Sequence, residues 1–336
     1  MKLTTMFAII CALFGGVRLA YAADPTPINI GVYPGTLQSV AAYIGRDMGI
    51  YERHGIKATL SDFRAAPEAT AALFSGSIDL MNNSIGNMML VNSRGKELVG
   101  IIDNYPAPVW GIVVRPEMPT PNQTAGYPAL IKDLKGKRIG VPAIGSEGHN
   151  FARRFVKDAG LDPEKDVTFL AVGLGPDALA GFKAKQIDGI IALEPVLTLL
   201  QHTGGKKLLD LYYDRVIPGF AAWTSNTWLT TREYADKHAD AMHRFQAAQE
   251  EVISVIRDSS KASQVGAIWA KYNKALSADD LTKIVSGLSG AFSVKFNCIG
   301  TDNVGKFMVE NNLVKPNHAQ TCEQLAWSGA GKYLDR

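Results

Sequence analysis

A glycine-flanked serine is the sharpest candidate for chemistry in this sequence. The segment Gly145-Ser146-Glu147-Gly148-His149 follows an apolar stretch and opens a helical one. A serine hydroxyl and the free N–H groups of a helix start can converge on an anion; the alternative is an ordinary serine cap beside a glycine turn. Ser146 and His149 also suggest a hydrolase, but isoleucine at position 144 leaves the Gly-x-Ser-x-Gly elbow incomplete. We therefore predict an anion-binding loop or a cap here, and no catalytic residue.

Two further segments place polar groups at the ends of predicted strands. Asn82-Asn83-Ser84 can orient a carboxylate or sulfonate or donate to carbonyls, whereas Ser84 can equally serve as a cap. Glu194-Pro195 ends an apolar run, so Glu194 is either an acceptor for a ligand amine or hydroxyl, or the cap of a helix that begins at Pro195. Both segments are candidates for ligand contact, with capping as the alternative.

Four aromatic residues fall on loop or crossover positions rather than in apolar runs: Tyr33, Tyr105, Trp110 and Trp223. Ligand pockets combine apolar walls with few polar groups, so these rings could stack on a flat or aliphatic ligand. For Trp110 and Trp223 the alternative is a core position beneath a hinge. No metal site or cofactor is expected, because three cysteines and six scattered histidines do not give ligand spacing.

An internal repeat indicates which elements position these residues. Ile30-Gly31-Val32 recurs as Ile139-Gly140-Val141, and Ile78-Asp79 recurs as Ile187-Asp188 with the same offset of 109 residues. Asp79 and Asp188 stand at strand starts, away from any cleft, and are expected to be structural. The shared offset predicts two copies of one folding unit.

Each copy alternates short strands with helices. The strands are expected at 28–32, 57–60 and 78–81 in the first copy and at 138–141, 167–172 and 187–193 in the second. Strands that alternate with helices of 67–74 and 176–183 imply parallel, doubly wound sheets. We therefore predict an α/β protein with two lobes, in which the loops beyond the carboxyl ends of the strands face one cleft.

The chain order indicates how the lobes are joined. After Leu229 the pattern changes to helices, with an amphipathic run over 231–257 and a capped start at Ser277. The stretches 115–128 and 215–224 flank the second copy and are expected to be the crossovers. Residues 23–112 and 225–336 would form the first lobe, and residues 113–224 an inserted second lobe.

The first 22 residues have the pattern of a cleaved secretory signal. Lys2 precedes an apolar run at 7–14, and Ala20-Tyr21-Ala22 is a small-x-small cleavage site. Cleavage would remove Lys2 and Arg18 and no acid, which lowers the net charge from +3 to +1. A nearly neutral chain lacks the basic surface that nucleic-acid binding needs. We predict a periplasmic protein, monomeric and without a nucleic-acid partner.

Two cysteines remain after the predicted cleavage. Cys298 and Cys322 form an even pair in an oxidising compartment, which favours a disulfide over a reactive thiol or a metal site. Two free buried thiols are the alternative. A disulfide of this loop length would contribute about 3 kcal/mol on the chain-entropy account.

Four segments carry a resemblance to a known family: 45–56 (GRDMGIYERHGI), 72–79 (ALFSGSID), 133–141 (DLKGKRIGV) and 187–195 (IDGIIALEP). Together they resemble, from about residue 28 to 290, the periplasmic binding proteins of nitrate/sulfonate/taurine ABC importers, the SsuA/THI5-like or NMT1-like group. The resemblance implies a type II binding-protein fold with a hinge and a central ligand cleft. It also implies delivery of one small ligand to a membrane permease that a cytoplasmic ATPase drives.

The resemblance and the residue patterns together give one candidate set of ligand contacts. By position, the family's contacts fall on the first loop, the loop after the third strand, the helix start at Ser146, and Glu194. The full set is Tyr33, Gly35, Thr36, Asn83, Ser84, Tyr105, Gly145, Ser146, His149, Glu194 and Trp223. The related pyrimidine-synthase enzymes carry a cysteine-rich iron motif that this sequence lacks.

The leading hypothesis is a non-enzymatic importer receptor for a small organic anion, such as a sulfonate or an aromatic acid, with a flat or apolar body. Two other classes remain open: a secreted enzyme that uses the same cleft, and a periplasmic sensor that signals to a membrane kinase.

Overall fold

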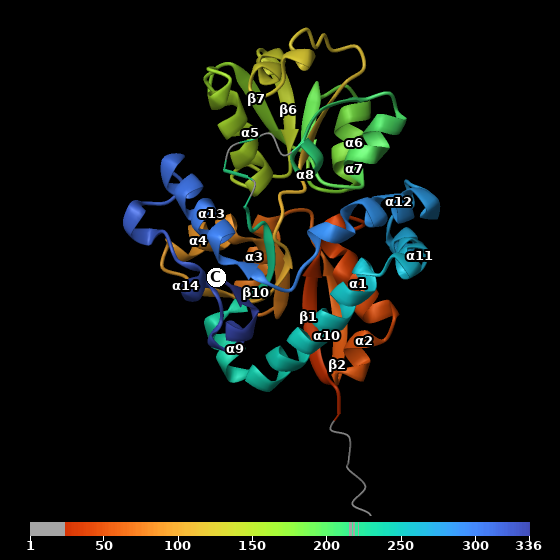
Figure 1. The fold of residues 1–336 in the computed structure, drawn as a ribbon, viewed down its shortest axis with the longest axis vertical. Coiled ribbons are helices and arrows are strands. Elements are labelled where there is room, and N and C mark those ends of the chain that lie inside the picture. Colours follow the sequence, from red (N-terminus) through yellow and green to blue (C-terminus); the bar gives the residue numbers. More distant parts are fainter. Residues whose placement is uncertain (1–23, 215–216, 218, 221) are drawn as a thin grey trace, which may run out of the picture.

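The computed structural model describes residues 24–336 except 215–216, 218 and 221, so the predicted leader, residues 1–22, lies outside the described residues. In the described part of the chain, two five-stranded sheets flanked by helices form two lobes, one above the other in Figure 1. The strand order is β2-β1-β3-β10-β4 in the first lobe and β7-β6-β8-β5-β9 in the second. The two sheets therefore share one topology.

The strands of the first sheet are β1 (Thr26–Val32), β2 (Ile56–Asp62), β3 (Leu80–Ser84), β4 (Leu98–Tyr105) and β10 (Asn226–Thr231). Those of the second are β5 (Gly111–Val114), β6 (Lys137–Val141), β7 (Val167–Ala171), β8 (Gly189–Ala192) and β9 (Lys206–Asp210). The first lobe carries α1 (Val40–Asp47), α2 (Ile50–Arg53), α3 (Ala66–Phe74) and α4 (Ile85–Asn92). The second carries α5 (Glu147–Asp158), α6 (Pro176–Lys183), α7 (Val196–His202) and α8 (Leu211–Asp214).

The predicted repeat is confirmed down to the strand register. β1 pairs with β3 through Ile30 and Leu80, and β6 pairs with β8 through Ile139 and Gly189, each residue 109 positions after its counterpart. Pairing with the edge strand follows the same offset, because β2 aligns with β1 as β7 aligns with β6.

The repeated aspartates stabilise the strand starts, as expected. The Asp79 Oδ2 atom accepts a hydrogen bond from the Asn29 N–H at 2.7 Å, and Asp188 Oδ2 accepts one from the Arg138 N–H at 2.9 Å. Each contact ties the residue before a lobe's third strand to its first strand, β1 or β6. Neither aspartate lines the cavity between the lobes.

The sheets are mixed, whereas the sequence predicted parallel sheets. β10 runs antiparallel to β3 and β4, and β5 runs antiparallel to β8 and β9. The parallel strands end at the cleft, so a strand that enters from the other lobe starts at the cleft and must run the opposite way. One antiparallel strand per sheet is therefore the consequence of connecting two lobes twice.

The first crossover also differs from the expectation. The chain leaves the first sheet at Tyr105 and enters the second at Gly111, so residues 106–110 connect the lobes and the stretch 115–128 follows β5. The return lies between α8 and β10, the region expected from the sequence.

The C-terminal part is helical and covers the first lobe (Figure 1). Its helices are α9 (Arg232–Lys237), α10 (Ala239–Arg257), α11 (Ala262–Tyr272), α12 (Ala278–Leu288), α13 (Cys298–Glu310) and α14 (Cys322–Leu325). The amphipathic run expected over 231–257 is divided at His238, and the Ser277 hydroxyl caps α12 by accepting from the Asp280 N–H at 3.1 Å. α10 packs against α1, α2 and β4, and α13 packs against α4.

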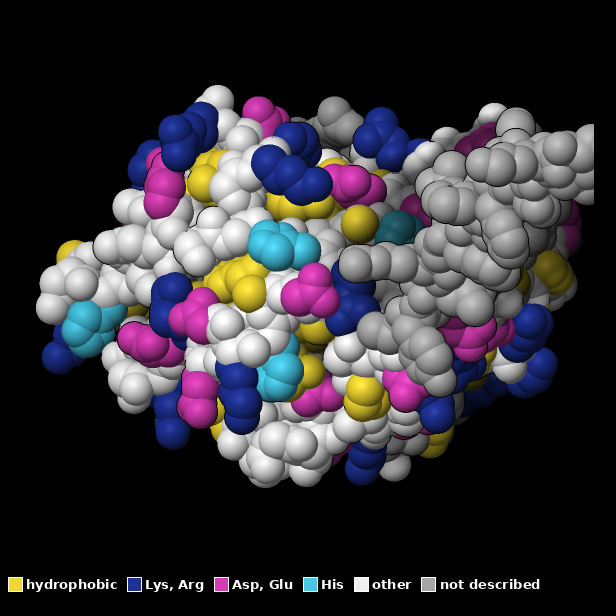
Figure 2. Space-filling model, turned by 90° about the horizontal axis from the view of Figure 1, so that it is seen from below, with side chains coloured by type: hydrophobic (Ala, Val, Ile, Leu, Met, Phe, Trp, Pro, Cys, Tyr) yellow, Lys and Arg dark blue, Asp and Glu magenta, His cyan; other side chains and the backbone are white. Residues whose placement is uncertain are grey.

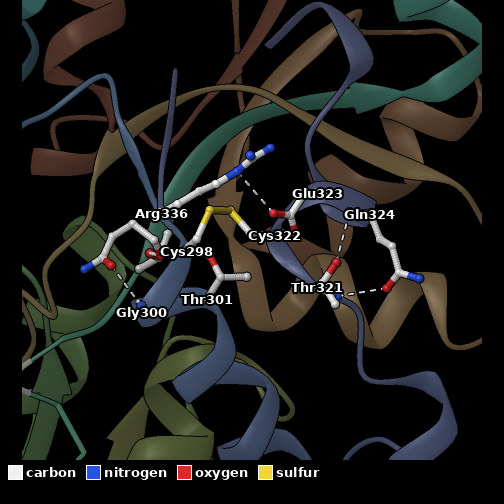
Figure 3. The surroundings of a disulfide bond; sticks show 10 residues. Cys298, Gly300, Thr301, Thr321, Cys322, Glu323, Gln324 and Arg336 are labelled. Atoms are coloured by element: carbon white, nitrogen blue, oxygen red, sulfur yellow. Dashed lines mark hydrogen bonds and ion pairs between the residues drawn. A yellow bond between two sulfur atoms is a disulfide. The ribbon is translucent and has the colours of Figure 1, made fainter. Parts of the chain in front are cut away.

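The disulfide between Cys298 and Cys322 is present, which confirms the predicted pairing (Figure 3). Each cysteine is the first residue of its helix, α13 or α14, and both side chains are buried. The short strands β11 (Phe296–Asn297) and β12 (Leu334–Asp335) pair in parallel next to this link. The disulfide therefore holds the C-terminal segment against the helix that packs on α4.

The surface charge is mixed. On the end of the molecule seen from below, Lys and Arg side chains alternate with Asp and Glu side chains rather than forming one basic field (Figure 2). Within residues 24–336, the described helices include none with the length and apolarity to cross a bilayer. The same residues bring together no group of three or more metal-ligating side chains.

Two glycines at equivalent positions of the repeat, Gly31 and Gly140, allow an isoleucine side chain to pack directly on the strand. A Cβ atom added at Gly31 would lie 2.7 Å from Ile78 Cδ1, and one added at Gly140 would lie 2.7 Å from Ile187 Cδ1. Gly31→Ala and Gly140→Ala should each lower the free energy of unfolding by about 1–3 kcal/mol, because the buried isoleucine must shift. Urea denaturation measures this, and Gly331→Ala, which meets nothing within 4 Å, is the control. Equal stability of all three variants would contradict the packing described.

Candidate ligand-binding site

A cavity of about 480 Å³ lies between the two lobes, where the parallel strands end. Its lining includes Tyr33 after β1, Ser84 at the end of β3, and Pro142 after β6. Helices α3 and α4 of the first lobe, the start of α5 in the second lobe, and Trp110 of the first crossover complete the wall. Both lobes and a crossover therefore contribute to one site.

The inner part of the cavity presents hydrogen-bond donors that have no partner. Tyr33 and Asn83 are 1% and 3% exposed, and the Tyr33 hydroxyl and the Asn83 Nδ2 group make no hydrogen bond to the described residues. The Asn87 Nδ2 group, which also lines the cavity, is buried and unpaired as well. An unpaired buried polar group costs about 1–3 kcal/mol, so these groups are arranged for something that accepts hydrogen bonds.

The outer part of the cavity is apolar and follows two helices. Ala71 and Phe74 face it from α3, and Leu90 and Val91 face it from α4. The lining follows the whole of α4, eight residues or about 12 Å of helix, from its cap Ser84 to Arg94 just beyond its end. The cavity thus suits a molecule with a polar head and an apolar body.

Both serines that the sequence singled out cap helices and also line the cavity. The Ser84 Oγ atom accepts from the Asn87 N–H at 3.1 Å, and the Ser146 Oγ atom accepts from the His149 N–H at 3.3 Å. Capping and ligand contact are compatible here, because a hydroxyl that accepts from the backbone still has a proton to donate. Gly145, next to Ser146, lines the same cavity.

Gly35 and Thr36 lie outside the lining of this cavity. The Gly35 carbonyl accepts from the Trp269 indole N–H at 2.9 Å, and the Gly35 N–H donates to the Tyr43 hydroxyl at 3.0 Å. The Thr36 hydroxyl donates to the Tyr33 carbonyl at 2.9 Å. Their hydrogen bonds shape the loop that presents Tyr33.

His149 and Glu194 also lie outside the lining. The His149 Nδ1 atom accepts from the Gly145 N–H at 2.9 Å, and burial lowers the pKa of its imidazole to about 4. The Glu194 carboxylate accepts from the Thr198 N–H and hydroxyl, both at 3.0 Å, so the capping interpretation describes its contacts. The helix that it serves begins at Val196, one residue later than expected.

Trp223 and Tyr105 are buried beside the cavity. Trp223 stacks on Phe220 with ring centroids 4.5 Å apart and meets Phe151 and Phe307 edge-on. Tyr105 is fully buried and meets Phe292 edge-on. Trp223 is thus a buried member of a ring cluster, and it also lines a small cavity between α4, α5 and α13.

Glu147 lines the cavity but is absent from the candidate set derived from the sequence. It is the first residue of α5, and its Oε2 atom accepts from the Trp110 indole N–H at 2.8 Å and from the Ser225 hydroxyl at 3.0 Å. Burial raises the pKa of its carboxyl to about 7 against the effect of these donors. Acids are common in the first turn of helices, so no pattern in the sequence indicates that this one faces inward.

Comparisons with known proteins agree with this architecture. A putative binding protein of Brucella abortus is 26% identical over 295 residues, which covers 86% of this chain and 84% of that protein. A putative aliphatic sulfonates-binding protein of Escherichia coli is 25% identical over 248 residues and covers 73% of this chain and 72% of its own length.

Solved structures show the fold. The periplasmic aliphatic sulphonate binding protein of E. coli superposes with a TM-score of 0.68 at 23% identity, covering 91% of this chain and 99% of its own. A protein of Bordetella bronchiseptica superposes with a TM-score of 0.77 at 19% identity, covering 92% of this chain and 96% of its own. A desulfurization enzyme superposes with a TM-score of 0.60 at 15% identity, covering 92% of this chain and 98% of its own. This fold therefore also occurs in an enzyme. The fold is that of the periplasmic binding proteins, and residues 21–257 match the model of the NMT1-like family, to which this chain belongs.

Proposed function

We propose that this protein is an extracytoplasmic solute-binding receptor of an ABC importer that holds a small organic anion between its lobes and delivers it to a membrane permease. The observation that carries the proposal is the pair of buried, unpaired donors, the Tyr33 hydroxyl and the Asn83 amide, inside a cavity between two lobes. A carboxylate or sulfonate would supply the acceptors they lack. The relatives named as binding proteins support the same class of function.

Closure around the ligand would use the two connections between the lobes. Residues 106–110 and the segment between α8 and β10 are the chain crossings about which the lobes can rotate. One contact between the lobes, from the Leu37 N–H to the Glu194 carbonyl at 2.9 Å, would form and break in this movement. We propose that the closed form is the one that the permease recognises.

A thermal-shift screen of organic acids tests the proposal. Sulfonates, aromatic carboxylates, nitrate and an uncharged amide are added in turn, because a ligand that binds only the native state raises the melting temperature. At least one organic anion should raise it while the amide does not, and the bound compound should be recovered unchanged. Recovery of a converted compound would support the secreted enzyme instead, and stabilisation by none of the acids would overturn the receptor for organic anions.

A single hydroxyl offers the cleanest test of the site. Tyr33→Phe removes an oxygen that has no protein partner, so the free energy of unfolding should stay the same or rise slightly. The affinity for the anion found in the screen should fall by about 1–3 kcal/mol, because a buried hydrogen bond to the ligand is lost. Calorimetric titration measures the affinity.

The matched control is Tyr51→Phe. The Tyr51 hydroxyl is also buried, but it accepts from the Gln249 Nε2 group at 2.7 Å and lies outside the cavity. This variant should lose stability and keep its affinity. Unchanged affinity in Tyr33→Phe would place the anion elsewhere.

A further inference from the structure

In the part of the chain that the structure describes, no cation pairs with the Glu147 carboxylate. Both groups that donate to its Oε2 atom, the Trp110 indole and the Ser225 hydroxyl, are neutral. Among the described residues that line its cavity, Arg94 is the only cation, and it is exposed at the far end of α4. Buried charges in proteins are normally paired, and this carboxylate has no such pair within the site.

The position of Glu147 in the cavity makes a ligand the candidate partner. The two donors come from the two connections between the lobes, 37 and 78 residues away along the chain, and they fix the side chain at the junction of crossovers and cleft. Glu147 lines both the main cavity and a small one between α4, α5 and α13. The carboxylate is thus held in place by the protein and still borders the space that a ligand would occupy.

Two sets of groups in the cavity lining have opposite requirements. Tyr33, Asn83 and Asn87 offer unpaired donors, which an acidic group would satisfy. A second acidic group placed at Glu147 would be repelled, whereas an ammonium or other protonated nitrogen would be attracted and would also donate to it.

Resting on the function proposed above, we infer that Glu147 is a specificity-determining ligand contact and that the ligand is an organic acid that also carries a protonated nitrogen, which binds the Glu147 carboxylate. The protein would then discriminate against otherwise identical acids without the nitrogen.

The pH dependence follows from the groups that face Glu147. Tyr105 is the titratable neighbour from β4, and burial raises the pKa of its hydroxyl well above the usual value, so it stays neutral. His149 is two residues further along α5, and burial lowers its pKa to about 4, so it is neutral between pH 6 and 8.5. Of the described residues that line the small cavity, which come from α4, α5, α13 and Trp223, Glu147 alone is ionisable. Because the Glu147 carboxyl has a pKa of about 7, it becomes fully charged between pH 6 and pH 8.5. Binding of an acid that also carries a protonated amine should therefore strengthen over this range.

Calorimetry with matched pairs of probes tests the inference. The pairs are 3-aminopropanesulfonate with propanesulfonate, 4-(aminomethyl)benzoate with 4-methylbenzoate, and 5-aminopentanoate with pentanoate, each titrated at pH 6 and 8.5. In at least one pair the amino compound should bind about tenfold or more tightly than its partner at pH 8.5, and this preference should shrink at pH 6.

Glu147→Gln keeps the shape and one acceptor oxygen but removes the charge. It should abolish the preference for the amino compound, while an unchanged melting temperature without ligand shows that the variant folds. Glu194→Gln is the matched control, since Glu194 is a half-buried glutamate of the same lobe that does not line the cavity, and it should keep the preference.

Three outcomes contradict the inference. Equal affinity within every pair, or a preference that survives Glu147→Gln, would overturn it and leave the proposed function in place. If none of the six probes binds, both the inference and the receptor for organic anions fail.

Discussion

Trp223→Ala should lower the free energy of unfolding by about 3–5 kcal/mol, the largest loss expected for any single substitution considered above. Trp223 is 3% exposed and joins a cluster with Phe220, Phe151 and Phe307, which come from the second connection between the lobes, α5 and α13. Removal of the indole leaves a cavity lined by these rings, and they can fill it only in part. Chemical denaturation measures the loss.

Trp223→Phe is the control for this cluster. A phenyl ring retains contact with Phe220 and Phe151, so the variant should lose less than half as much stability as Trp223→Ala. A loss below about 1 kcal/mol for Trp223→Ala would show that the ring cluster does not stabilise the junction between the lobes.

Replacement of both Cys298 and Cys322 by serine should lower the free energy of unfolding by about 3 kcal/mol. The disulfide closes a loop of 24 residues and thereby restricts the unfolded chain. It also holds α14 against α13, the helix that packs on α4 beside the ligand cavity. Urea denaturation of the double variant and of the oxidised parent measures this difference in the free energy of unfolding.

Reduction of the parent protein provides the matching measurement. Dithiothreitol should reproduce most of the loss in the parent and have no effect on the double variant. Equal stability of the oxidised parent and the double variant would contradict the stabilising role of the disulfide.

The sequence predicted the architecture because the relevant interactions recur locally. The 109-residue offset between Ile30-Gly31-Val32 and its second copy corresponds to the same strand pairing in both sheets. The helix caps at Ser84, Ser146 and Ser277 were also predictable, since a cap depends on residues within three positions of one another.

The mixed sheets and the first crossover could not be predicted in the same way. The direction of β5 and β10 depends on where the chain passes between the lobes, and no local pattern reports that. The proline-rich composition of 115–128 suggested a connection, but the actual crossing at 106–110 is short and lies between two strands of high apolarity.

The candidate site was predicted in part for a related reason. Tyr33, Asn83, Ser84, Gly145 and Ser146 line the cavity because each follows or ends a strand of the repeat, and strand ends of this topology face the cleft. Gly35, Thr36, His149, Glu194 and Trp223 occupy similar positions along the chain, yet their contacts are made with the protein itself.

The sequence by itself determined the two-lobed α/β fold, the helix caps and the cysteine pair, because backbone pairing and capping depend on residue types at short, repeated spacings. Only the tertiary structure decided which side chains face the cavity. The direction of Glu147 depends on Trp110 and Ser225, which are distant in sequence and meet it only when the two crossovers come together. The unpaired donors of Tyr33 and Asn83 likewise become visible only when every neighbour is in place.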